Sequence, residues 1–101
     1  MITHIVFFWL KNPQSQEDRD RLLEGVRGLG AIPQVRSVQA GIPAQTEARD
    51  AVDHSFGVSE VLTFDSLEDQ LAYQQHPLHL RFIEEYGDLW EGHKVYDIVA
   101  P

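Results

Sequence analysis

The segment T-H-I-V-F-F-W-L, at positions 3–10, carries the strongest structural signal in this 101-residue chain. It is rich in β-branched and aromatic residues, which favour an extended strand. Its alternating positions are apolar in both rows, Ile5, Phe7 and Trp9 in one and Val6, Phe8 and Leu10 in the other. A strand that is apolar in both rows is typically buried on both faces. The sequence therefore predicts a central strand here, with a layer of structure on each side.

The residues that follow this strand predict a helix and then two more strands. Ser15 has the S-x-x-D spacing of a helix start, and glycines and a proline at residues 28–33 mark the end. The buried side of this helix is expected to consist of Leu22, Leu23, Val26 and Leu29. Residues 34–42 and 54–64 are expected to form the second and third strands, with Glu60 interrupting the apolar row of the third. The polar segment between them is expected to be a loop.

The second half of the chain predicts a helical region that a proline divides, and then a last strand. Ser66 again has the spacing of a helix start. The inner side of this helix is expected to carry Leu67 and Leu71. The helix should end at His76, because a residue before proline disfavours the α conformation, and Pro77 should begin the next helix. Residues 93–99 are expected to form the fourth strand.

The order of these elements is βαββαβ, within a single domain over residues 1–101. This order is typical of the ferredoxin-like fold, an α+β arrangement in which a four-stranded antiparallel sheet carries its helices on one face. The bare face would then expose a larger apolar patch than monomers usually tolerate. We therefore predict a homodimer in which two sheets stack face to face, a dimeric α+β barrel.

The composition limits the partners of the chain. The net charge is −8, with 16 acidic and 8 basic residues, which disfavours nucleic acid and anionic membranes. Cysteine is absent, so disulfides and thiolate chemistry are excluded, and a cytoplasmic location is expected. The apolar run after His4 is too short for a membrane span and lacks the flanks of a signal peptide. No cofactor motif occurs, so no cofactor and no metal are predicted.

Three stretches carry a resemblance to a known family: H-I-V-F-F-W-L-K at residues 4–11, E-V-L-T-F-D-S-L-E-D-Q-L-A-Y-Q-Q-H-P-L-H at 60–79 and L-W-E-G-H-K-V-Y-D-I-V at 89–99. The chain resembles the stress-responsive α/β-barrel (Dabb) domains, which are dimeric ferredoxin-like proteins. The family is functionally mixed. Most bacterial members have no assigned activity, one plant member looks protective, and another, olivetolic acid cyclase, is a polyketide cyclase. The resemblance implies that the row of His4 lies under the helices and that the row of Phe7 and Trp9 faces the partner.

The motif Y-x-x-H-P-x-H at residues 73–79 carries the functional part of this resemblance. In the cyclase the motif supplies a tyrosine and a histidine to the reaction, and these positions are Tyr73 and His79 here. A histidine near the start of the first strand of the cyclase matches His4. A further histidine on its third strand has no counterpart, because Val58 stands in that place. The resemblance thus implies a related site that is not a copy.

His79 supports two interpretations from its own position. It lies on the apolar side of the last helix, on a stripe with Ile83, Tyr86 and Trp90. A neutral imidazole in an apolar pocket is suited to remove a proton from a carbon acid, so His79 is a candidate general base. The same position suits a core histidine whose nitrogens bind a backbone carbonyl or a tyrosine hydroxyl.

The other candidates also have two interpretations each. Tyr73 is either a hydrogen-bond donor to a substrate carbonyl or a packed aromatic with its hydroxyl at the rim. His76 is expected to end one helix and cap the next. A metal site on His76 and His79 is disfavoured, because the proline between them disturbs their common helix face. His4 either points into the same pocket or lies at a strand end in water.

Two functions of different class follow from these candidates. The first is a small cofactor-independent enzyme that acts on a carbonyl compound by cyclisation, isomerisation or a related carbon-acid step. Its base would be His79, with Tyr73 and His4 as partners and pocket walls from Phe8, Phe82, Tyr86 and Trp90. The second is a non-catalytic dimer that binds a small-molecule ligand or protects other proteins, with structural histidines. A cavity that has His79 and Tyr73 on its wall would favour the first.

Overall fold

The computed structural model describes all of residues 1–101 and has the predicted order of elements. The strands are β1 (Ile2–Leu10), β2 (Ser37–Gly41), β3 (Val58–Phe64) and β4 (Trp90–Val99). The helices are α1 (Gln16–Gly28), α2 (Leu67–Gln75) and α3 (Pro77–Tyr86), and the 3₁₀ turns η1 (Leu29–Ala31) and η2 (Gly87–Leu89) follow α1 and α3. The proline at position 77 divides the second helical region, as predicted.

The strands form one antiparallel sheet with the order β2-β3-β1-β4. In this sheet β1 lies between β3 and β4, which confirms its central place. The register puts His4 opposite Asp97 of β4 and Val6 opposite Glu60 of β3. Side chains of directly opposite residues lie on the same face, so residues from three strands meet under the helices. The chain thus has the predicted α+β, ferredoxin-like fold.

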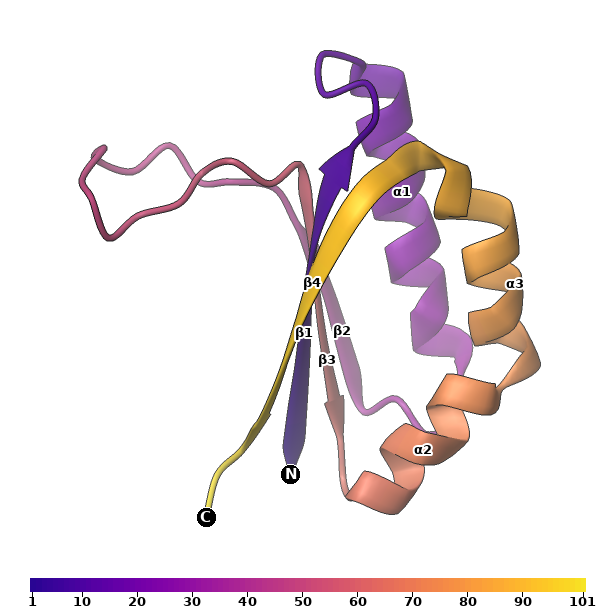
Figure 1. Ribbon diagram of the computed structural model, residues 1–101. Coiled ribbons are helices and arrows are strands. Elements are labelled where there is room, and N and C mark those ends of the chain that lie inside the picture. The colour runs from indigo at the N-terminus through magenta and orange to yellow at the C-terminus, as the bar shows by residue number, and fades with distance from the viewer.

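The two faces of the sheet have different surroundings. Figure 1 shows the sheet nearly edge-on, with all three helices on one side of it. The β1 row that includes His4, Val6 and Phe8 is buried under these helices, as the resemblance implies. The other row, with Phe7 and Trp9, is only half-buried. We call the face that carries this second row the open face.

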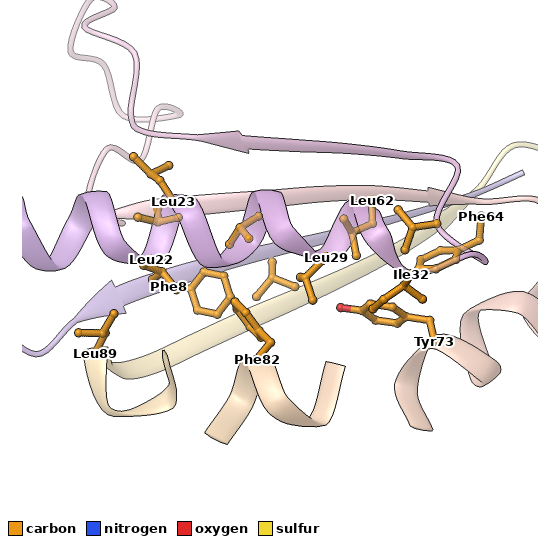
Figure 2. Packing of buried hydrophobic residues seen from close by; sticks show 14 of the residues in the cluster. Phe8, Leu22, Leu23, Leu29, Ile32, Leu62, Phe64, Tyr73, Phe82 and Leu89 are labelled. Atoms are coloured by element: carbon orange, nitrogen blue, oxygen red, sulfur yellow. The ribbon is translucent and has the colours of Figure 1, made fainter. Parts of the chain in front are cut away.

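The hydrophobic core lies between the sheet and the helices, and Figure 2 shows its side chains from close by. The predicted stripe of α1 is entirely buried: Leu22, Leu23, Val26 and Leu29. Burial of each such side chain stabilises the fold by about 1.5 to 3 kcal/mol. No helix combines the length and the apolar character that a membrane span requires.

Local hydrogen bonds fix where the helices begin. The Ser15 hydroxyl accepts from the Asp18 backbone N–H at 3.1 Å, and the Ser66 hydroxyl accepts from the Asp69 N–H at 3.1 Å. Both residues therefore cap helices as predicted. His76 ends α2 and begins α3, because its Nδ1 accepts from the Leu78 N–H at 3.1 Å.

The inner side of α2 differs from the prediction. Leu67 and Leu71 are each 65% exposed, whereas Tyr73 is buried. At 100° per residue, Tyr73 lies about 140° around the helix from the two leucines, so only one of these sides can face the core. The chain turns at His76, and the aromatic side is the one that reaches β3 and β1. Tyr73 fills the space between β1, β3 and α3 by packing its ring against those of His4, Phe64 and His79, which leaves the leucines on the outer side of α2.

The end of α3 also differs from the prediction. The helix ends at Tyr86, and Trp90 is the first residue of β4 rather than the last of a helical stripe. Gly87 directly follows the helix, and η2 turns the chain toward the sheet. The fourth strand accordingly starts three residues earlier than predicted.

The segment between β2 and β3, residues 42–57, projects on the side of the sheet opposite the helices (Figure 1). Part of it packs back on the open face. The indole N–H of Trp9 donates to the Ser55 hydroxyl at 3.0 Å, and the rings of Phe7 and Phe56 have centroids 4.9 Å apart. The predicted loop is therefore longer than expected and belongs to the open face.

Candidate functional site

A cavity of about 170 Å³ lies between the sheet and helices α2 and α3. It opens near Ile83 and Val95, which are both exposed. Its wall consists of His4, Val6, Phe8, Glu60, Tyr73, Gln74, His79, Phe82, Ile83, Trp90, His93 and Val95. The predicted candidates His4, Tyr73 and His79 thus meet in one place, although they come from β1, α2 and α3.

His4 is buried on β1 and held by neighbours from other elements. Its Nδ1 lies 2.6 Å from Asp97 Oδ1, because the register puts the two residues opposite each other. The Gln70 amide of α2 donates to the same carboxylate oxygen at 3.0 Å. A carboxylate only accepts, so the Nδ1 of His4 carries the hydrogen in this bond. In a neutral imidazole this arrangement leaves Nε2 as the acceptor.

Glu60 is the most buried carboxyl side chain, with only 2% of its surface exposed. One of its carboxyl oxygens lies 3.5 Å from His4 Nε2. Burial raises the pKa of Glu60 to about 8, from an ordinary value of 4.5. In the sequence Glu60 is evident only as an interruption of an apolar row. That interruption, a carboxyl between Val58 and Leu62 on a buried face, was the available signal for a functional residue.

Tyr73 is almost entirely buried among aromatic rings. Its ring centroid lies 4.5 Å from that of His79, 5.1 Å from that of Phe64 and 5.9 Å from that of His4. Figure 2 shows its hydroxyl directed into the molecule. Burial, and secondly the charge of Glu60, raise the pKa of Tyr73 above its ordinary range. The phenol therefore keeps its hydrogen at every physiological pH and is available as a donor.

His79 lies at the joint between α2 and α3. Its Nδ1 donates to the Gln74 backbone carbonyl at 3.0 Å. This carbonyl belongs to the last turn of α2, where the break before Pro77 removes the usual helical partner. Burial lowers the pKa of His79, although the bond to Gln74 opposes this shift. The imidazole is therefore neutral near pH 7, with Nε2 as an acceptor.

Aromatic rings form the remainder of the wall. Trp90 lies with its ring centroid 4.7 Å from Phe8 and 5.8 Å from Phe82, and the ring of His93 stacks on Phe8 at 6.5 Å. Phe8, Phe82 and Trp90 therefore line the cavity, as does His93, which the sequence analysis did not identify. Tyr86 does not line it, because its ring packs against Gly25 of α1.

Two further differences concern the supporting residues. Asp97 and Gln70 hold His4, and neither was identified from the sequence, because their proximity depends on strand register and helix rotation. His76 does not line the cavity and serves as a helix cap. The His, Cys, Asp and Glu side chains form no group of three or more that could hold a metal ion.

The sequence matches the stress responsive A/B barrel domain family over residues 2–100. No curated protein is similar enough in sequence to match the chain. Several solved structures have the same fold. A Dabb family protein with a ferredoxin-like fold from Mesorhizobium loti has 22% identity and a TM-score of 0.79, with 99% of this chain and 96% of that chain covered.

Two other structures are informative by their descriptions. A dimeric ferredoxin-like protein of unknown function from Thermobifida fusca has 18% identity and a TM-score of 0.78, with 98% of this chain and 90% of that chain covered. A hydroxynitrile lyase from Passiflora edulis has 24% identity and a TM-score of 0.75, with 99% of this chain and 93% of that chain covered. At these identities the likeness shows a common fold and leaves activity to the site itself.

Proposed function

The chain belongs to the stress-responsive A/B barrel domain family, and from that premise and the geometry of its cavity we propose that it is a cofactor-independent enzyme that transfers protons on a small carbonyl compound. The reaction class is that of a cyclase, isomerase or lyase, in which a proton leaves the carbon next to a carbonyl group. One observation carries the proposal. Five ionisable side chains from five different elements line one cavity: His4, Glu60, Tyr73, His79 and His93.

His79 is the general base in this proposal. Its Nδ1 hydrogen is committed to the Gln74 carbonyl, which leaves the lone pair of Nε2 to accept a proton. The lowered pKa of His79 keeps the ring neutral and ready to accept. The same hydrogen bond fixes the orientation of the ring, which reduces the entropy cost of the reactive geometry.

Tyr73 is the donor that stabilises the negative charge formed on the carbonyl oxygen. Its ring lies against that of His79, so donor and base can act on the same small molecule. Its raised pKa keeps the phenol protonated. A donor that is already in place when charge develops lowers the barrier without further reorganisation.

His4 and Glu60 are the second proton-carrying pair. Asp97 fixes the Nδ1 hydrogen of His4, so Nε2 faces the carboxyl of Glu60 at 3.5 Å. The raised pKa of Glu60 gives the pair a proton at neutral pH. Such a pair can return a proton to the product or protonate a leaving group. Asp97 acts through His4 and is therefore a positioning residue.

The hydroxynitrile lyase from Passiflora edulis supports the proposal only in general terms. Its name describes an enzyme, so this fold can host catalysis on a small molecule. At 24% identity nothing about its substrate carries over to this chain. The reaction proposed here rests on the side chains of this cavity.

The proposal predicts that the protein accelerates hydrogen exchange at the carbon next to a carbonyl group. Acetophenone in deuterated buffer is a suitable probe, because proton NMR follows the loss of its methyl signal. Wild-type protein should increase the exchange rate, and His79→Ala should reduce the increase by about 10² to 10⁴, the usual contribution of a general base. Tyr73→Phe should reduce it less, because it removes a donor and leaves the base.

His54→Ala is the matched control for this experiment, because His54 lies in the loop on the other side of the sheet and contacts Thr46. It should exchange acetophenone at the wild-type rate. Binding of acetophenone without faster exchange would contradict the proposed enzymatic activity. It would favour the alternative, a non-catalytic dimer that binds a small-molecule ligand or protects other proteins. A lowered melting temperature of His79→Ala, with unchanged exchange by its folded fraction, would contradict the role of His79.

A homodimer through the open face is the second part of the proposal. Phe7 and Trp9 are only half-buried there, and Tyr96 and Ile98 of β4 are exposed beside them. An apolar sheet face of this kind is usually covered by another layer. Related structures described as dimeric support a second copy as that layer. The cavity lies on the other face, so the dimer would leave it accessible.

A further inference from the structure

The cavity wall has no lysine or arginine side chain that could bind an anionic ligand. The chain has 8 Lys and Arg residues, and none of them lines the cavity. Lys94 is next to His93 and Val95 in sequence, but it pairs with Phe7 and so lies on the open face. Arg81 is next to Phe82, but it lines a separate groove between α1 and α3.

The ionisable groups at the inner end of the cavity also disfavour a bound anion. Glu60 on the wall carries no positive charge in either protonation state, and the Asp97 carboxylate binds the far nitrogen of His4. The hydrogen of His4 Nδ1 is already used by Asp97, and that of His79 Nδ1 is used by Gln74. A carboxylate that entered would lose its water without a positive partner, which is costly. A neutral carbonyl or hydroxyl group needs only hydrogen bonds.

The aromatic part of the cavity wall favours a flat ring. Phe8, Phe82 and Trp90 surround it, and His93 stacks on Phe8. Aromatic side chains favour stacked or edge contacts with another ring. A cavity of roughly 150 Å³ holds one benzene ring. The volume of about 170 Å³ therefore fits one ring with a small substituent.

We propose that the cavity selects an uncharged molecule made of one flat ring and a small carbonyl or hydroxyl substituent, and that it rejects the corresponding carboxylate. The ring would lie among Phe8, Phe82 and Trp90, and the substituent would point toward Tyr73 and His79. This inference rests on the proposed function, since it names the substrate class of the same site. The selection comes from the missing cation and the aromatic wall together.

Benzamide and benzoate test the charge part of the proposal, because they have nearly the same shape and differ in charge at neutral pH. Two-dimensional NMR titration of the wild-type protein should show benzamide at the cavity and bound at least about tenfold more tightly than benzoate. Cyclohexanecarboxamide, which has a puckered ring, should bind more weakly than benzamide. Equal binding of benzoate, or no binding of benzamide, would overturn the inference.

A substitution at the cavity mouth gives a second, independent test. Val95 is 43% exposed and lines the cavity, so Val95→Lys adds a cation without disturbing the core. It should strengthen benzoate binding by about tenfold or more and change benzamide binding little. Val99→Lys is the matched control. Val99 is exposed on the same face of the same strand and does not line the cavity, so benzoate binding should stay at the wild-type level.

The outcomes separate the two proposals. Benzoate binding that Val95→Lys does not improve would overturn the inference about charge, whatever acetophenone exchange shows. Equal binding of cyclohexanecarboxamide and benzamide would overturn the preference for a flat ring. If the protein prefers benzamide to benzoate but does not accelerate hydrogen exchange, the proposed enzymatic activity is wrong and the inferred ligand class stands.

Discussion

Glu60 shows at the scale of one residue how burial changes the protonation of an ordinary carboxyl. Its neighbours along β3 are Val58 and Leu62, both entirely buried. Its one close polar partner is His4, at 3.5 Å. Burial without a strong ion pair disfavours the charged form, which explains the raised pKa of Glu60. The same burial thus has two effects: Glu60 holds a proton at neutral pH, and its ionisation at high pH lowers the stability of the fold.

The raised pKa of Glu60 predicts that the stability of the protein depends on pH. The pKa of Glu60 is about 8 in the folded protein and 4.5 ordinarily. Between these values the folded state holds a proton that the unfolded state releases, so the free energy of unfolding falls as pH rises. This stabilisation is complete below pH 4.5 and lost as pH passes about 8. Its full size is up to roughly 5 kcal/mol.

Urea denaturation at several pH values measures this effect. The free energy of unfolding of wild type should fall between pH 5 and 8, and Glu60→Gln, which cannot ionise, should remove most of the fall. Glu84→Gln is the matched control, because Glu84 is exposed on α3. It should keep the wild-type pH dependence. A wild-type curve that coincides with that of Glu60→Gln would show that Glu60 titrates normally.

Close packing of α1 against α3 is the main feature at the scale of elements. Gly25 of α1 meets the ring of Tyr86, and a Cβ at Gly25 would lie 2.8 Å from two ring carbons. The glycine therefore allows the helices to approach, and α3 in turn carries His79 and Phe82 to the cavity. This contact links the position of the site to one small residue.

Gly25→Ala should lower the free energy of unfolding by about 1 to 3 kcal/mol, because the ring of Tyr86 must move away from the added methyl group. Gly28→Ala is the matched control in the same helix, since a Cβ there meets no atom within 4 Å. It should leave stability unchanged or raise it by up to about 1 kcal/mol, as alanine favours helix. Thermal or urea denaturation of both variants checks the difference. Equal effects would contradict the close contact.

Element boundaries depend on local contacts, whereas the rotation of a helix depends on distant ones. The helix starts at Ser15 and Ser66, and the joint at His76, were predictable because they depend on hydrogen bonds between residues a few positions apart. The rotation of α2 was not predictable. Its leucines and Tyr73 compete for one face, and the outcome depends on the space left between β1, β3 and α3.

The candidate site was predictable where it depends on local features of the sequence and unpredictable where it depends on contacts between distant residues. His4, Tyr73 and His79 could be identified as candidates, because the family motif and the parity of β1 are local properties. The partners of His4 could not be identified. Asp97 is 93 residues away along the chain and becomes its neighbour only through the register of β1 with β4. Glu60 was not identified as a candidate either, because a single carboxyl in an apolar row does not reveal from the sequence whether it is buried in a cavity wall.

At the scale of the whole molecule the two faces of the sheet carry different features. The helix side holds the cavity, and the open side holds the apolar row of β1 and the projecting segment at residues 42–57 (Figure 1). Trp9 and Phe7 anchor that segment through Ser55 and Phe56. An interface on the open side can therefore stabilise the sheet without closing the cavity.

The last prediction is that charge on the open face separates the dimer. Tyr96 is 50% exposed and pairs with Ile5 on that face, so Tyr96→Glu would place a carboxylate between the two sheets. A buried unpaired charge opposes association, and the dissociation constant should rise by about 100-fold or more. Sedimentation velocity should find wild type as a dimer at micromolar concentration and Tyr96→Glu as a monomer with an unchanged circular dichroism spectrum. Val99→Glu, on the other face of the same strand, should remain a dimer. A monomeric wild type, or dissociation by Val99→Glu alone, would mean that the open face is not the interface.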